Sequence, residues 1–454
     1  MLVLDLLPIF MFLALAVLMF TGYPVAFILG GTSLAFGLIG YYLDVFSLIE
    51  FYNITARIWG GVAEKPVLVA IPMFIFMGTM LEKSGVATDL LYCLQVLLRR
   101  VPGGLAISVT LMGTILAATT GIVGASVIMM TLLALPVMLA RGYQIELSTG
   151  TIAASGTLGI LIPPSIMLVI LADLLAVSVG TLFVAALIPG LVLSGLYIVY
   201  IVVFCAVKPN LAPALGKDEG PSSRSELTAM IFRSFLPPVF LIVLVLGSIF
   251  FGWATPTEAG GVGAFGAILL ALAKGNLKFA IVKEVVERFS KTNVMIFMIF
   301  LGATAFSYVF RSLGGDDIIA AFFEEMGMGP AGIVFFMLIT VFLMGFFFDW
   351  IEIILIVLPV FTPILESLEM GAHVAQEDFL VWFAILIAVN LQTSYLTPPF
   401  GYALFYMKGA ATPGVTMQHI YRGIIPFVIL QLTGLAIIVA FPSLVLWLPS
   451  VMAR

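Results

Sequence analysis

The chain has 454 residues, of which 62% are hydrophobic and only 9% are charged, and its mean hydropathy is +1.23. A water-soluble domain of this length carries many more charges on its surface, so the composition excludes a soluble enzyme or a soluble binding module. The formal net charge of −5 says little about partners, because the position of charges matters more than their sum in a membrane protein. We expect a polytopic protein of the lipid bilayer with no nucleic-acid partner.

Apolar runs of spanning length recur along the chain without the period-two alternation of a β-barrel, so they predict helices. In the first half, we predict spans at residues 8–20, 25–41, 66–82, 147–173 and 180–207. In the second half, we predict spans at residues 236–252, 258–273, 292–310, 379–407 and 420–447. Two further apolar segments, 104–140 and 330–366, are each broken in the middle and too short for two crossings, which predicts re-entrant helical hairpins. The predicted fold class is an all-α bundle with paired hairpins.

The two halves of the chain resemble each other. The run GTLGILIPPSIMLVI at 156–170 is similar to QTSYLTPPFGYALFY at 392–406, and Pro398-Pro399 lies 235 residues after Pro163-Pro164. Internal repetition at matching positions indicates a duplicated unit. We predict a first repeat at 1–207, a polar cytoplasmic linker at 208–233, and a second repeat at 234–454.

The distribution of Lys and Arg predicts the orientation. With the N-terminus outside, the predicted inner loops hold 15 of the 19 basic residues, and the outer side holds Arg57, Lys65, Arg311 and Arg454. This asymmetry agrees with the positive-inside rule. Five predicted crossings per half is an odd number, so the two repeats are expected to be inverted relative to each other, with both termini outside.

The paired prolines at 163–164 and 398–399 predict two discontinuous helices, a mark of secondary transporters. A helical proline lacks its N–H and frees the carbonyl four residues earlier, here the carbonyls of Gly159, Ile160, Ser394 and Tyr395. An unsatisfied carbonyl costs several kcal/mol in lipid, and a hard cation such as Na+ prefers oxygen ligands. A single proline pair could be explained as a kink in a buried helix. The repetition of the break at matching positions favours a paired ion site instead.

The hairpin tips carry the remaining polar residues. The first tip contains hydroxyl and glycine residues that could bind an ion or serve close helix packing, namely Thr119, Thr120, Gly121, Gly124 and Ser126. The second tip carries Asp349 and Glu352 in an apolar context. Buried carboxylates are expensive and indicate function by default, unless the tip reaches an aqueous vestibule or the acids pair internally.

Five runs of the sequence together resemble a known family. They are PMFIFMGTMLEKSGVATDLL, GTLGILIPPS, GWATPTEAGGVGAF, GFFFDW and VNLQTSYLTPPFGYALF. They are similar to the large membrane subunit, the DctM-type permease, of tripartite ATP-independent periplasmic (TRAP) transporters. The resemblance implies an elevator-type carrier of the bacterial cytoplasmic membrane that is coupled to Na+ and needs no other cofactor. It also implies a small four-helix membrane subunit (DctQ-type), a periplasmic substrate-binding protein (DctP-type) and a small organic acid as substrate.

The family's sodium sites, built largely from backbone carbonyls, carry over by motif. The first site would use Thr119, Thr120, Gly121, Gly124, Ser126, Gly159, Ile162 and Pro164. The second would use Gly345, Asp349, Ser394, Thr397 and Phe400. Candidates for the substrate cavity are Ser165, Asn390, Thr393 and Tyr395. The chain departs from the family where Ala125 replaces a serine and where Ser394 and Tyr395 stand at a position that is often glycine.

Two other functions stay open. A proton-coupled organic-anion carrier on a related scaffold would depend on Asp349 and Glu352, and its uptake would follow pH. A membrane-embedded enzyme would need a nucleophile with a base or a metal cluster, and the chain has only two histidines and two cysteines. We therefore predict no catalytic residues and no bound metal other than sodium.

Overall fold

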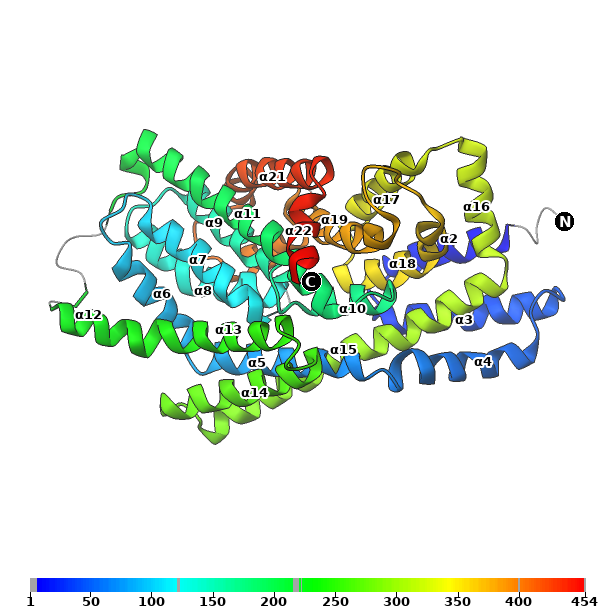
Figure 1. Ribbon diagram of the computed structural model, residues 1–454, viewed down its shortest axis with the longest axis horizontal. Helices are drawn as coiled ribbons and strands as arrows, with labels where there is room; N and C mark the ends of the chain where they lie inside the picture. The colour runs from blue at the N-terminus through cyan, green and yellow to red at the C-terminus, as the bar shows by residue number, and fades with distance from the viewer. Residues whose placement is uncertain (1–5, 121–122, 215–219, 222, 399–400, 453–454) are drawn as a thin grey trace.

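The computed structural model describes residues 6–120, 123–214, 220–221, 223–398 and 401–452, without the side chains of 117–120. Within these ranges the secondary structure is helical, with no strand. Figure 1 shows the helices packed side by side in an elongated body, with the buried helix α19 (Gln376–Leu396) near its centre. The prediction of an all-α membrane protein is confirmed.

The first half of the chain contains a long series of helices joined by short turns. They are α2 (Leu7–Met19), α3 (Val25–Tyr42), α4 (Leu48–Ile58), α5 (Ala70–Lys83), α6 (Val86–Leu97), α7 (Gly104–Thr120), α8 (Val123–Ala140), α9 (Ile145–Thr157), α10 (Ile166–Leu174) and α11 (Val179–Val207). A π-helical turn, Trp59–Ala63, follows α4, and a 3-10 turn, Pro66–Val69, leads into α5.

The second half begins with α12 (Arg224–Met230), which a π-helical turn joins to α13 (Leu236–Phe250). The helices that follow are α14 (Pro256–Ala273), α15 (Phe279–Ser312), α16 (Gly315–Met326), α17 (Pro330–Met344), α18 (Trp350–Ser367), α19, α20 (Tyr402–Ala410), α21 (Met417–Ala440) and α22 (Ser443–Met452). Among the described residues, ten helices are long and apolar enough to cross a membrane.

Several helices begin or end at other residues than the predicted spans and linker do. The predicted span at 292–310 is part of α15, a continuous helix of 34 residues. The end of the predicted linker 208–233 is helical, because α12 begins at Arg224, and the predicted span 420–447 is divided between α21 and α22. The first predicted span is α2, whose 13 residues reach only about 20 Å, less than the hydrocarbon core.

The order of elements agrees with the expected duplication. In each half a long helix ends at a left-handed glycine, Gly85 (φ 77°) or Gly314 (φ 88°), and a short amphipathic helix follows. A helix pair and a broken helix then follow in both halves, α7–α8 with α9–α10 and α17–α18 with α19–α20. Because α8 and α18 each have 18 residues, their length alone permits a crossing. The inversion of the repeats and the re-entry of the hairpins therefore stay predictions.

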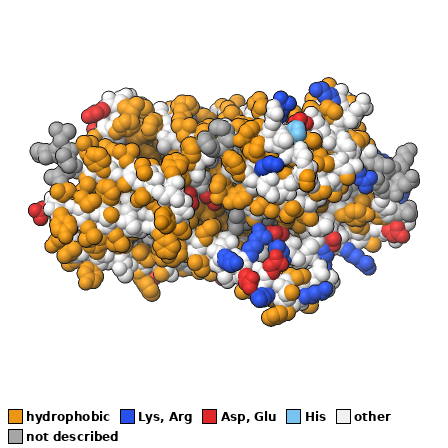
Figure 2. Space-filling model, turned by 180° about the vertical axis from the view of Figure 1, so that it is seen from behind, with side chains coloured by type: hydrophobic (Ala, Val, Ile, Leu, Met, Phe, Trp, Pro, Cys, Tyr) orange, Lys and Arg blue, Asp and Glu red, His pale blue; other side chains and the backbone are white. Residues whose placement is uncertain are grey.

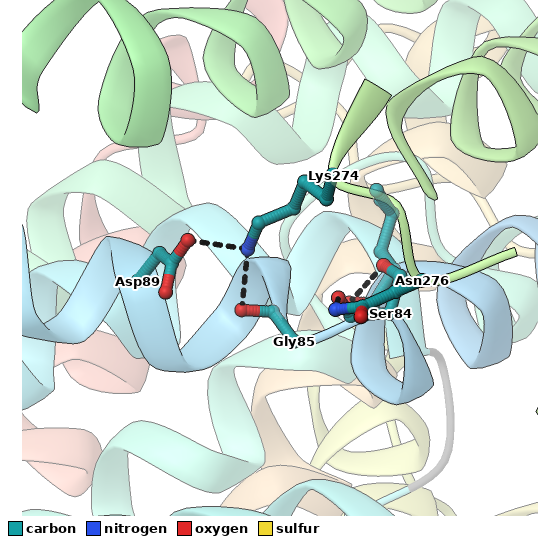
Figure 3. A network of polar contacts seen from close by, with 6 residues as sticks. Ser84, Gly85, Asp89, Lys274 and Asn276 are labelled. Atoms are coloured by element: carbon teal, nitrogen blue, oxygen red, sulfur yellow. Dashed lines mark hydrogen bonds and ion pairs between the residues drawn. The ribbon is translucent and has the colours of Figure 1, made fainter. Parts of the chain in front are cut away.

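A polar network ties the α5–α6 turn to the α14–α15 turn (Figure 3). The Lys274 ammonium donates to the carbonyl of Gly85 (2.8 Å) and pairs with Asp89 (2.5 Å), and the Asn276 amide donates to the carbonyl of Ser84 (2.8 Å). Two ion pairs lie farther along α15, Lys83–Glu284 (2.5 Å) and Arg288–Glu82 (2.6 Å). These contacts connect helices about 190 residues apart in the chain.

Hydrophobic side chains cover much of the surface, as Figure 2 shows for one face, where charged side chains gather mainly in limited regions. Exposed examples include Leu13, Phe27, Phe240 and Phe265. A soluble monomer does not expose apolar surface on this scale. In contrast, the two broken helices lie inside: 94% of an 18-residue window in α19 is buried, as is every residue of α9 from Leu147 to Thr157.

Candidate functional site

The first break lies between α9 and α10. A 3-10 turn, Leu158–Ile160, ends α9, and the Pro163-Pro164 peptide bond is cis. The Ser165 hydroxyl donates to the Ile160 carbonyl (2.6 Å), so that carbonyl is not free as predicted. The carbonyls of Gly159 and Ile162 accept no hydrogen bond from the described part of the chain. Both residues are buried, so this break presents oxygen acceptors in the interior.

The second break lies between α19 and α20. The Thr397 N–H donates to the Ser394 carbonyl (3.1 Å), and the Thr397 hydroxyl donates to the Thr393 carbonyl (2.8 Å). The prediction that Pro398 frees the Ser394 carbonyl is therefore wrong, because a tighter turn replaces the lost helical bond. The helix resumes after Gly401, whose positive φ of 25° lies in the half of backbone space that favours glycine. Phe400 of the predicted second site lies outside the described residues.

The first hairpin, α7–α8, packs against both broken helices. A Cβ added to Gly124 would lie 2.8 Å from the ring of Tyr406 on α20, and one added to Gly156 on α9 would lie 2.7 Å from Val127 on α8. The first tip therefore contacts the second broken helix as well as the first. Ser126 is buried beside this contact. Gly121, and the side chains of Thr119 and Thr120, lie outside the described part of the chain.

The second hairpin, α17–α18, packs its tip on the end of α19. A Cβ added to Gly345 would lie 2.0 Å from the Ser394 hydroxyl, so these two predicted residues are in direct contact. Asp349 caps α18 by accepting from the Trp350 N–H (2.8 Å), and Glu352 accepts from the Asp349 N–H (3.2 Å). The two half-buried carboxylates thus form a capping box, and the Tyr395 hydroxyl faces Asp349.

The predicted cavity residues divide by their partners. The Asn390 amide donates to the Leu338 carbonyl (2.7 Å), which links α19 to α17. The hydroxyl of Thr393 donates within its own helix to the Val389 carbonyl (2.9 Å). Together with Ser165, these side chains are committed to backbone groups and fully or nearly fully buried. Tyr395 is also fully buried, beside the second tip.

Gln392 is a polar residue that the predicted site omitted. It is fully buried on α19 and its amide donates to the Thr157 hydroxyl (3.3 Å) at the end of α9 and to the Tyr197 hydroxyl (3.5 Å) on α11. Its amide oxygen accepts no hydrogen bond from the described residues. A buried unsatisfied polar atom is expensive. The sequence offered one signal for Gln392, its position six residues before Pro398. Its contact with the other half of the chain could not be read from the sequence.

The arrangement therefore brings each hairpin tip into contact with a broken helix inside the bundle. Its groups are backbone carbonyls, hydroxyls and two carboxylates. Among the described residues, no group of three His, Cys, Asp or Glu could hold a metal ion. These oxygen donors suit a hard monovalent cation or a hydrogen-bonded polar ligand better than a transition metal.

Comparisons with known proteins agree with this architecture. Residues 12–444 match the family model described as the DctM component of the tripartite ATP-independent periplasmic transporters. The C4-dicarboxylate TRAP transporter large permease protein DctM of Pseudomonas aeruginosa is 30% identical over 86% of this chain and 87% of its own. The ectoine TRAP transporter large permease protein TeaC of Halomonas elongata is 25% identical over 96% of this chain and 97% of its own.

Among solved structures, the YdaH transporter of Alcanivorax borkumensis shares the fold with a TM-score of 0.62 and 15% identity, covering 86% of this chain and 87% of that one. MtrF of Neisseria gonorrhoeae has a TM-score of 0.55 and 14% identity, covering 89% and 84%. At this identity the likeness concerns the fold alone. The match to the family model spans nearly the whole chain, so the chain belongs to the DctM family of large TRAP transporter permeases, which are transporter subunits and not enzymes.

Proposed function

We propose that this permease imports a small organic acid from the periplasm across the bacterial cytoplasmic membrane, driven by the sodium gradient. Three relatives are named as C4-dicarboxylate permeases and two as permeases for ectoine or hydroxyectoine. A substrate with one or more carboxylates is common to these names. Two partners complete the proposal, namely a small four-helix membrane subunit (DctQ-type) and a periplasmic binding protein (DctP-type) that delivers the substrate.

One observation carries the proposal: each hairpin tip packs against a helix that is broken inside the bundle. Gly345 contacts Ser394 at the second break, and Gly124 contacts Tyr406 just beyond it. Matched broken helices at a repeat interface are where secondary transporters hold substrate and coupling ions. A gate that rests on the ligand site can close only when the site is correctly filled.

Sodium is proposed to bind at both breaks. The first site combines the first tip (Thr119, Thr120, Gly121, Gly124 and Ser126) with the carbonyls near Gly159, Ile162 and Pro164. The second combines Gly345, Asp349, Ser394 and Phe400 with the Thr397 hydroxyl, which already donates to the Thr393 carbonyl and so has lone pairs left to accept or coordinate. Substrate would bind between the tips, where Tyr395 and Gln392 shape the wall. The loaded domain would then move as a rigid body against α2, α3, α13 and α14 in an elevator motion.

The direct test is thermal unfolding of the purified protein, titrated with NaCl against KCl at constant ionic strength. An ion that binds only the folded state, at a concentration 100 times its dissociation constant, raises the free energy of unfolding by about 2.7 kcal/mol. We expect Na+ to raise the unfolding midpoint and K+ to leave it unchanged. In Thr397→Val, the NaCl concentration that gives half of the shift should rise about tenfold, which corresponds to one lost charge-assisted contact.

Thr433→Val is the matched control, because the Thr433 hydroxyl makes the same bond to a carbonyl one helical turn earlier (2.8 Å to Ile429) but is exposed on α21. Its titration should equal that of the wild type. If Na+ and K+ act alike in the wild type, sodium coupling is wrong. If the midpoint then rises as the pH is lowered, the capping-box carboxylates Asp349 and Glu352 become the proposed coupling groups of a proton-driven carrier.

A further inference from the structure

A cavity of about 630 Å³ lies where the end of α10, the last turns of α15 and the middle of α18 meet the end of α4 and the segment that follows it. Arg57, Lys65, Asp173, Arg311 and Pro359 are among its lining residues. Its volume lies within the range of small-molecule sites. The sequence placed Arg57, Lys65 and Arg311 on the outer face without relating them to each other, so their convergence on one cavity is a result of the fold.

The charges of the cavity do not cancel. Lys65 pairs with Asp173 (2.7 Å), the acidic residue of the lining. Arg311 lies 3.6 Å from Asp316, which is not part of the lining, and also donates to the Pro359 carbonyl. The Arg57 guanidinium lies 6.0 Å from the centre of the Tyr308 ring, and no carboxylate of the described chain lies within 4 Å of it. Three cations thus face one acid.

The lining also contains hydroxyl groups and apolar side chains. The hydroxyl groups belong to Thr304, Ser307, Tyr308, Ser312 and Thr362, and the apolar side chains include Leu174, Phe300 and Leu355. Hydroxyls and guanidinium groups together donate the hydrogen bonds that a carboxylate accepts. A low-dielectric cleft lined by one sign of charge also concentrates ions of the opposite sign. The chemistry of the cavity therefore favours a small anion with several oxygen atoms.

Two helices lead from this cavity to the broken helices. α18 begins at the second tip, and Leu355, which lines the cavity, is six positions after Asp349, or about 9 Å along the helix. α10 begins directly after the first break, and Asp173 is eight positions after Ser165, or about 12 Å. The cavity is therefore close to the proposed substrate site and on the predicted outer side of it.

We propose that this cavity captures the substrate before transport, with its carboxylate held by Arg57, Lys65 and Arg311. This inference rests on the proposed function, because it assigns an entry point to the same substrate. A lipid phosphate offers similar anionic oxygens, and the test below distinguishes it from a soluble anion. The assigned occupant is a small organic anion with at least one carboxylate.

The test measures the potential inside the cavity with a single cysteine. Ser307→Cys places a thiol in the lining, and both native cysteines, Cys93 and Cys205, are buried. Its rates of modification by a negatively charged and a positively charged methanethiosulfonate reagent are compared in sodium-free choline buffer. We expect the anionic reagent to react about tenfold faster. Adding Arg57→Gln should remove most of that preference, and it breaks no described ion pair.

Ser450→Cys, an exposed position on α22, is the control and should show no comparable preference. Succinate should slow the modification of Ser307→Cys and lose this effect in the Arg57→Gln, Lys65→Gln background. Equal rates with the two reagents, or no protection by succinate, would overturn the proposal. Protection only by anionic phospholipid in nanodiscs would assign the cavity to a lipid instead. Because the assay contains no Na+, a failure of sodium coupling does not affect its outcome.

Discussion

At the scale of single residues, the contact between Gly345 and Ser394 shows how a predicted site residue can have a second role. Gly345 has an ordinary helical φ of −65°, so the backbone does not require glycine there. An added Cβ would lie 2.0 Å from the Ser394 hydroxyl and 2.7 Å from its Cβ. Glycine is needed because the hairpin tip approaches α19 too closely for any side chain.

Gly345→Ala should therefore lower the free energy of unfolding by about 1–3 kcal/mol, the usual cost of overpacking. In the Gly345→Ala background, Ser394→Gly should recover part of this loss because it removes both clashing atoms. The measurement is a double-mutant cycle by denaturation in detergent. Gly31→Ala is the control, since an added Cβ meets nothing within 4 Å there, and it should not destabilise. Additive effects of the two substitutions would contradict the contact.

At the scale of elements, the turns after α5 and α14 show how a polar contact fixes two helices. The Lys274 side chain is 22% exposed, and its ammonium binds both a carbonyl and a carboxylate (Figure 3). Hydrogen bonds from a charged group contribute more than an exposed ion pair. This network therefore fixes the start of α6 to the turn between α14 and α15.

Lys274→Met should destabilise the protein by about 1–2 kcal/mol, because the Gly85 carbonyl loses a charged donor while the apolar stem is kept. Lys283→Met is the matched control: its ion pair with Glu287 is 3.8 Å long and exposed on both sides, and its loss should cost at most about 0.5 kcal/mol. The two values are compared by chemical denaturation. Equal losses in the two variants would show that the network contributes no more than a surface pair.

At the scale of the whole molecule, the predicted orientation in the membrane depends on the distribution of Lys and Arg between the two sides. Lys291 on α15 is exposed and predicted to be cytoplasmic, whereas Ser450 on α22 is exposed and predicted to be periplasmic. In cells whose outer membrane is permeabilised, a membrane-impermeant maleimide should label Ser450→Cys and not Lys291→Cys, with the buried native cysteines as background. Labelling of both positions in lysed cells is the control. If only Lys291→Cys is labelled while the cytoplasmic membrane is intact, the true orientation is the inverse of the predicted one.

Much of the fold could be predicted because its signals are local. Apolar runs identified the helices, and the repeated prolines located both breaks within a few residues. The boundaries that failed, such as the start of α12 and the unbroken α15, fall where polar residues continue a helix beyond the apolar run. Helix propensity does not end where hydropathy ends.

The sequence by itself determined a helical membrane protein with two matched breaks, because hydropathy and the missing proline N–H act on the residues that carry them. Only the structure showed that local hydrogen bonds satisfy two of the predicted carbonyls: the Ser165 hydroxyl donates to the Ile160 carbonyl, and the Thr397 N–H donates to the Ser394 carbonyl. It also joined Gln392 to Thr157 and gathered Arg57, Lys65 and Arg311 around one cavity. The Gln392–Thr157 hydrogen bond and the charge of the cavity depend on contacts between residues hundreds of positions apart, which no local pattern encodes.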